Sequence, residues 1–199
     1  MAEMEKMIPH ILLWEVGKTK EEREEKIWEG LTPRQIYERV RSRGYHNLPN
    51  DKGGPTMCGV THRTFTEWCR WVGRPKPTVE GLKGLGYDEW LEILKGLFWR
   101  PCGADYILNQ SIAEMLVDWR WVNGTQAVRD AQTVLSCVAD GIVGPKTLAA
   151  LNDRDEEGVF TRLKNARLRS YTRIVERNPS QGKWLNGWKN RTNSIHYEP

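Results

Sequence analysis

The sequence predicts a mostly α-helical protein. Apolar residues recur at helical spacing in nearly every segment, whereas alternating apolar and polar runs closed by hairpin turns are scarce. The chain has 199 residues, 39% of them apolar, and 18 glycines, which is long enough and apolar enough to bury a core. This composition excludes a disordered chain, a collagen and a disulfide-stabilised miniprotein.

The N-terminal part is expected to hold two helices and one long loop. A first helix covers residues 4–16, and a charge-dense stretch follows at 18–29. Thr32 can cap a second helix, which has proline at its first position and ends near Gly44. In residues 45–55 proline, glycine, asparagine and aspartate crowd together, which predicts an irregular loop. Loops of this length in compact domains often carry function.

The remaining helices are expected where apolar residues recur three and four positions apart. They cover residues 61–72, 87–99, 106–122, 125–138, 145–151, 157–177 and 182–195. The best internal boundary falls near residues 104–111. The sequence therefore predicts two parts, 1–108 and 109–199, which pack as one unit.

Several partner classes are not expected. No stretch approaches 18 uncharged apolar residues, which argues against membrane insertion, and no secretory signal is recognisable. The four cysteines form no CxxC pair, so we predict reduced thiols, no metal site and no cofactor. A net charge of +4 and ten tryptophans leave two polymers open, glycan and nucleic acid.

Glu15 is a candidate general acid on the first helix. At 100° per residue it projects about 20° from Ile8, between Ile11 and Leu12, in the middle of an apolar stripe. Burial disfavours the charged form of a carboxyl group, and a general acid that works near neutral pH needs this. The alternative is a structural carboxylate that pairs with a lysine or arginine, or reaches water.

The loop supplies a second carboxylate. Asp51 is followed by Gly53, Gly54 and Thr56, a backbone that can turn tightly and present a carboxylate and a hydroxyl together. Two carboxylates are the minimal apparatus of a glycosidase, because one protonates the leaving oxygen and the other activates water or attacks the sugar. The alternative is that Asp51 only stabilises its own turn.

A basic strip is expected on the penultimate helix. Between its ends it contains no acidic residue, and its members are Arg162, Lys164, Arg167, Arg169 and Arg173. Such a strip can bind phosphates or the carboxylates of a bacterial cell wall, or it can simply face solvent. A helical nucleic-acid binder is one hypothesis, but the chain has no recognition motif, so nucleic acid is not the expected partner.

Several motifs follow one another in order along the chain. They are Ile8–Gly17, Gly44-Tyr45, Asn47, Asp51–Gly54, Thr56, Gly59–Thr61, Phe98–Pro101, Asp118, Val122–Gly124 and Ala139–Thr147. Those up to residue 124 resemble the lysozyme-like part of glycoside hydrolase family 108. The last motif and the helices after it are similar to the predicted peptidoglycan-binding region that usually follows. The resemblance spans about residues 7–195.

This resemblance implies a lysozyme-like helical domain and a helical peptidoglycan-binding part. It also implies an N-acetylmuramidase, which hydrolyses the β-1,4 bond between N-acetylmuramic acid and N-acetylglucosamine in the glycan strands of peptidoglycan. Glu15 takes the place of the catalytic glutamate, and Asp51 and Thr56 complete the catalytic set. The residues expected to line the cleft are Tyr45, Asp118 and Asn123.

The chain departs from the family pattern at two points. Val16 stands where the family has glycine, and an insertion at residues 18–43 separates Gly17 from Gly44, where the family is contiguous. The insertion either closes as a helical excursion with its ends held together, or it displaces the loop and leaves a degenerate site. A second Trp-Glu-Gly makes Glu29 the alternative acid.

Two functions therefore stay open. One is a muramidase, and the other is a catalytically degenerate protein that binds the wall or assists secretion, since some members of the family are named secretion activators. Without a recognised signal, the protein is expected to be made in the cytoplasm and to act at the wall or in the periplasm. A holin or a dedicated secretion machinery would then export it.

Overall fold

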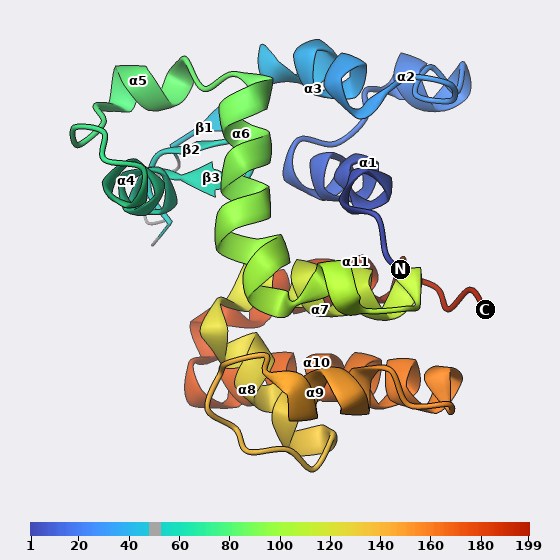
Figure 1. Cartoon of the computed structure of the whole chain (residues 1–199). Coiled ribbons are helices and arrows are strands. Elements are labelled where there is room, and N and C mark those ends of the chain that lie inside the picture. The colour runs from blue at the N-terminus through green and yellow to red at the C-terminus, as the bar shows by residue number, and fades with distance from the viewer. Residues whose placement is uncertain (48–52) are drawn as a thin grey trace. The chain divides into compact units, whose positions relative to one another are not determined.

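The computed structural model describes residues 1–47 and 53–199, and it confirms the mostly α class (Figure 1). Helices dominate, and one small three-stranded sheet accompanies them. The chain divides into two compact units, one formed by residues 5–97 and the other by residues 1–4 and 98–199. Each unit is described by itself below.

The first unit contains six α-helices in the part of the chain that the structure describes. They are α1 (Met4–Glu15), α2 (Lys20–Glu24), α3 (Pro33–Arg41), α4 (His62–Trp71), α5 (Val79–Lys83) and α6 (Tyr87–Ile93). Helices α1, α3 and α4 lie where the sequence predicts them. Helices α2 and α5 were not expected, because five residues are too few to show a helical period. Helix α6 is shorter than predicted, since the chain continues as a π-helix over Leu94–Trp99.

Local sequence explains how α3 begins. The Thr32 side chain accepts a hydrogen bond from the Gln35 amide, and the Gln35 side chain accepts one from the Thr32 amide. This reciprocal pair satisfies two amides that the first turn leaves without helical partners. The predicted cap is therefore confirmed, and the proline follows it at the first helical position.

The sheet corrects the prediction of a wholly irregular loop. Strands β1 (Tyr45–His46), β2 (Thr56–Met57) and β3 (Val60–Thr61) pair antiparallel in the order β1-β2-β3. The two residues between β2 and β3, Cys58 and Gly59, both have positive φ, as a type I′ hairpin turn requires. Strand β1 depends on pairing with a segment ten residues away, so its own sequence does not reveal it.

An aromatic cluster holds this hairpin in place. The Tyr37 ring from α3 packs against the Tyr87 and Trp90 rings from α6, with ring centroids 5.6 and 5.5 Å away. The Trp90 indole donates a hydrogen bond to the Cys58 carbonyl over 2.9 Å, and the Cys58 amide donates to the Gly44 carbonyl over 2.9 Å. Core packing therefore fixes the position of the turn at Cys58.

The second unit is a bundle of helices. It contains α7 (Gln110–Asn123), α8 (Thr125–Val134), α9 (Pro145–Leu151), α10 (Glu156–Arg177) and α11 (Leu185–Asn193), with short 3-10 segments at Arg100–Cys102, Ala104–Tyr106 and Pro179–Trp184. Helix α7 begins later than predicted, because the Asn109 side chain caps it by accepting from the Ile112 amide. The other four lie close to their predicted ranges.

A buried charge cluster joins α7, α10 and α11. Asp118 is fully buried, and its carboxylate accepts hydrogen bonds from Arg167 over 2.6 Å and from Arg191 over 2.7 Å. Arg167 is also fully buried, so it does not belong to the basic strip expected on this helix. Arg173, another member of that strip, pairs with Asp130 on α8. The charges of α10 therefore serve partly to hold the bundle together.

Replacing Asp118 with asparagine should destabilise the second unit. The Asp118→Asn variant leaves two arginines in the interior without a counter-charge, which typically costs about 3–5 kcal/mol. Urea denaturation at neutral pH would measure the loss. Asp153→Asn is the matched control, because this exposed side chain can still accept from the Asp155 amide. A loss below about 1 kcal/mol in Asp118→Asn would contradict this role.

Candidate active site

Glu15 is the last residue of α1, and the helix presents it at the end of a buried apolar face. Ile8, Ile11 and Leu12 are fully buried, whereas Glu15 is half-buried. The chain leaves the helix through Gly17, whose φ is +80°. Val16 does not have positive φ, so a valine fits there without backbone strain although the family pattern has glycine.

The Glu15 side chain lies directly against the hairpin turn. A methyl group built on Gly59 would stand 2.5 Å from the Glu15 Cγ and 2.9 Å from its Oε2. Any larger residue at 59 would therefore displace the carboxylate. Because Gly59 also has a φ of +82°, glycine meets two demands at this position. The structure thus brings the candidate acid to the hairpin that carries Thr56.

Thr56 lies on β2, three residues before Gly59. It is 5% exposed, and its hydroxyl donates a hydrogen bond to the Gly54 carbonyl over 3.0 Å. In the sheet register Thr56 stands opposite His46 on one side and Thr61 on the other. Residues directly opposite one another share a face of a sheet. One face of the sheet therefore carries a hydroxyl, an imidazole and a second hydroxyl.

The structure places Tyr45 on the opposite face of this sheet. Successive residues of a strand point to opposite sides, so Tyr45 and its partner Met57 face away from Thr56. The Tyr45 ring is half-buried, with the Lys83 ammonium 5.0 Å from its centroid. It borders a hollow of about 470 Å³ with Glu38, Arg41, Ser42, Met57 and Lys83. Tyr45 and Thr56 therefore do not line one common surface.

The other expected site residues fall in different places. Asp51 lies outside the described residues. Asp118 is enclosed among helices of the second unit, and Asn123 lines a pocket of that unit. The alternative acid, Glu29, sits in a turn with 70% of its side chain exposed and 3.6 Å from Lys26. Of the two candidate acids, Glu15 is the one in contact with the hairpin.

His46 was not among the predicted site residues, although the register puts it beside Thr56. It is half-buried and faces the same side of the sheet as the threonine. Sequence offered no signal for this, because the neighbour relation depends on the pairing of β1 with β2. Among residues 1–47 and 53–199, no group of three or more potential metal ligands is present.

Cys58 has a structural part in the turn. The side chain is fully buried, and burial raises the pKa of its thiol to about 12. A thiol in this state is a poor nucleophile, since the thiolate is the reactive form. Its sulfur lies so close to Gly44 that a methyl group there would stand 2.3 Å from it. Gly44 is thus required by packing against the hairpin.

The segment 18–43 closes on itself as a helical excursion. Glu22, which is 2% exposed, accepts hydrogen bonds from Arg39 over 2.9 Å and from Arg43 over 2.5 Å. Arg43 also donates to the Gly17 carbonyl over 3.2 Å. The last residue of the segment is therefore tied to Gly17, which directly precedes the segment, and of the two outcomes considered from sequence the closed excursion is the one found.

The electrostatics of Glu22 follow from these contacts. Burial alone would raise the pKa of its carboxyl group. The hydrogen bond from the Thr19 amide and the two arginines outweigh burial and lower the pKa from 4.5 to about 2. Glu22 is therefore ionised at neutral pH, where its ion pairs with Arg39 and Arg43 are fully formed.

The chain has the features of a peptidoglycan-related hydrolase. Residues 28–124 match the family model described as Glycosyl hydrolase 108, and residues 126–193 match the one described as Predicted Peptidoglycan domain. Together the two matches cover most of the sequence. Residues 28–124 are thus similar to the glycosyl hydrolase 108 family, and residues 126–193 are similar to a predicted peptidoglycan domain. The resemblance seen in the sequence is thereby confirmed.

A solved structure agrees with this assignment. The chain is similar to the structure of Brucella abortus SagA, with 26% sequence identity and a TM-score of 0.66, over 81% of this chain and 89% of that one. No curated protein matches the sequence. None of the helices in the described ranges is long and apolar enough to cross a membrane.

The extent of the family match bears on the two candidate acids. The match begins at residue 28, inside the segment 18–43, so it includes Glu29 and Thr56 but not Glu15. Geometry favours Glu15, because only its contact with the hairpin is present in the structure. The match thus contains one candidate acid and the geometry favours the other, and mutagenesis can distinguish them.

Stability should depend on pH through Glu22. A lowered pKa means that its ion pairs contribute fully above about pH 4.5 and are lost as the pH falls toward 2. The shift corresponds to at most about 3 kcal/mol. Urea denaturation across this range should show Glu22→Gln destabilised at pH 7 and with a flatter pH dependence. Glu24→Gln, which removes only an exposed pair with Lys20, should match the wild type within about 0.5 kcal/mol.

Replacing Gly59 with alanine should displace Glu15. The new methyl group overlaps the carboxylate, and the positive φ adds roughly 1–2 kcal/mol of strain. Gly30→Ala is the matched control, because Gly30 has φ +81° and open space around it. Urea denaturation should show Gly59→Ala less stable than Gly30→Ala. Equal losses in the two variants would contradict the contact with Glu15.

Proposed function

We propose that the protein is an N-acetylmuramidase that hydrolyses the β-1,4 bond between N-acetylmuramic acid and N-acetylglucosamine. The observation that carries the proposal is the contact between Glu15 and Gly59, in the turn of the hairpin that carries Thr56. A carboxyl group that is half-buried at the end of an apolar helix face is held in place and can still reach a substrate. The family assignment supports the same reaction class.

In this mechanism Glu15 is the general acid. It protonates the glycosidic oxygen as the bond to the sugar breaks, and the developing oxocarbenium ion needs a nucleophile or an activated water on its other side. Asp51 is proposed for that second role, with the Thr56 oxygen as a hydrogen-bond acceptor for the water. The Thr56 hydroxyl hydrogen is already used on Gly54, so its free lone pair is what it offers.

The proposed partner is the glycan strand of peptidoglycan, and the proposed place of action is the wall or the periplasm. The predicted peptidoglycan domain at residues 126–193 supports this partner. The net charge of +4 also favours an anionic polymer, since opposite charge raises the local concentration of the protein at the wall. Export by a holin or a dedicated secretion machinery completes the proposal.

The decisive experiment measures new reducing ends released from purified sacculi at about pH 6. Glu15→Gln should bind the sacculi as the wild type does and cut at least about 100-fold more slowly, because proton transfer contributes that much to catalysis. Glu29→Gln is the matched control and should cut normally. Equal cutting by wild type and Glu15→Gln would refute the role of Glu15, and loss of cutting in Glu29→Gln would assign the acid to Glu29.

The second candidate function is a catalytically degenerate protein that binds the wall or assists secretion. It is favoured by the family match, which starts after Glu15. In the same experiment, this function predicts that the wild-type protein pellets with the sacculi but releases no reducing ends. Binding and cutting are measured together, so each function has its own signature.

A further inference from the structure

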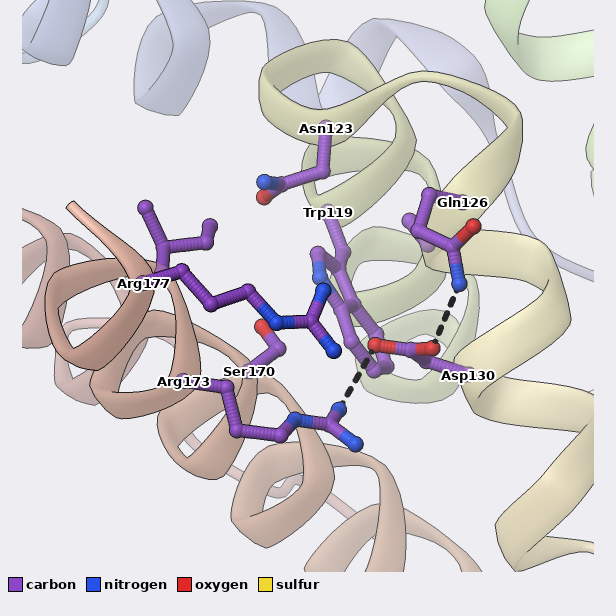
Figure 2. A pocket seen from close by; sticks show the side chains of 9 residues that line it. Trp119, Asn123, Gln126, Asp130, Ser170, Arg173 and Arg177 are labelled. Carbon is purple, nitrogen blue, oxygen red and sulfur yellow. Dashed lines mark hydrogen bonds and ion pairs between the residues drawn. The ribbon is translucent and has the colours of Figure 1, made fainter.

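The second unit contains a polar pocket that the muramidase mechanism does not use. It has a volume of about 190 Å³ and is formed by α7, α8 and α10. Figure 2 shows its lining, which consists of Trp119, Asn123, Gln126, Ala127, Asp130, Ser170, Arg173, Ile174 and Arg177. One water molecule takes up roughly 30 Å³ of liquid, so the pocket has room for a small polar group of several atoms.

One side of the pocket offers hydrogen-bond acceptors. The Asn123 side-chain oxygen is buried and has no hydrogen-bond partner within residues 1–47 and 53–199. A buried acceptor without a partner weakens the fold, and a donor that enters the pocket would satisfy it. The nearby Asp130 carboxylate is held in place by Gln126 over 2.8 Å and by Arg173 over 2.9 Å.

The other side offers a cation. In Figure 2 the Arg177 side chain extends from the end of α10 across the pocket toward Trp119 and Asp130. Within the described part of the chain its guanidinium has no hydrogen bond or ion pair, whereas Arg173 on the preceding turn is already paired with Asp130. A guanidinium binds a carboxylate through two parallel hydrogen bonds. Arg177 is thus free to receive one.

We infer that this pocket binds the head group of an amino acid, which carries a carboxylate and an ammonium. The carboxylate would pair with Arg177, and the ammonium would donate to the Asn123 oxygen and the Asp130 carboxylate. A phosphate is disfavoured, because the Asp130 carboxylate in the lining repels a second anion. The pocket therefore has the charge pattern of a zwitterion and lacks that of a nucleic-acid site.

The source of the head group follows if the proposed partner is right. Peptidoglycan whose stem peptides contain a diamino diacid presents a free ammonium and a carboxylate on the same carbon wherever that residue is not cross-linked. The pocket would then recognise uncross-linked stems. This source rests on the proposed function, but the head-group site itself does not.

Titration calorimetry and NMR on the full chain would test the site. The probes are a soluble disaccharide-tripeptide that ends in diaminopimelate, the same molecule with the carboxylate next to its free ammonium amidated, and free diaminopimelate. We expect the first to bind and to shift the Asn123 side-chain amide signals, and the amidated probe to bind about tenfold or more weakly. Arg177→Gln should lose the same factor. Arg169→Gln, an exposed arginine on the same helix outside the pocket, should bind normally.

Each result decides the inference. No binding, or equal binding by the amidated probe, would overturn the site. Tight binding of free diaminopimelate with no preference for the muropeptide would support the site and overturn the wall as its source. Binding is measured at the peptide end of the probes, which the proposed hydrolase does not cut. It is therefore measured independently of reducing-end release. A protein that binds the probe but does not cut sacculi would refute only the muramidase.

Discussion

The arrangement of the first unit depends on the ion pairs around Glu22. Holding together the ends of a flexible segment such as 18–43 costs conformational entropy, although this cost grows only slowly with length. Arg43 offsets it by binding both the Glu22 carboxylate and the Gly17 carbonyl, so the chain leaves and re-enters at nearly the same point. Gly44 then follows directly, where its carbonyl receives the Cys58 amide. An insertion that looked disruptive in the sequence thereby leaves Gly44 in place against the hairpin.

The hairpin next to this closure holds the Glu15 carboxylate in place. The Trp90 indole holds the hairpin from one side, and the positive φ at Cys58 and Gly59 gives the tight turn. The missing side chain at Gly59 leaves the space that Glu15 occupies. A glycosidase acid needs such a setting, because its carboxyl group must be held at the scissile bond while an open side admits the sugar. The register of the sheet places His46 opposite Thr56, on the same face, so the imidazole is next to a residue of the proposed catalytic set.

The second unit shows two uses of buried polar groups. The Asp118 carboxylate is paired, since Arg167 and Arg191 both donate hydrogen bonds to it. This cluster joins three helices. At the pocket, the Asn123 oxygen and the Arg177 guanidinium have no partners in the described ranges. Satisfied groups stabilise a fold, whereas unsatisfied ones at a cavity indicate a ligand. This contrast separates a residue that was expected to meet substrate, Asp118, from the pocket that the fold leaves open.

The sequence by itself determined what depends on near neighbours along the chain. The helical class, the cap at Thr32 and the apolar face that ends at Glu15 follow from residues three or four positions apart. Only the tertiary structure decided strand β1, the contact of Glu15 with Gly59, and the burial of Asp118. Each of these joins segments far apart in the sequence, and pairing, burial and charge neutralisation are set by partners that periodicity does not reveal.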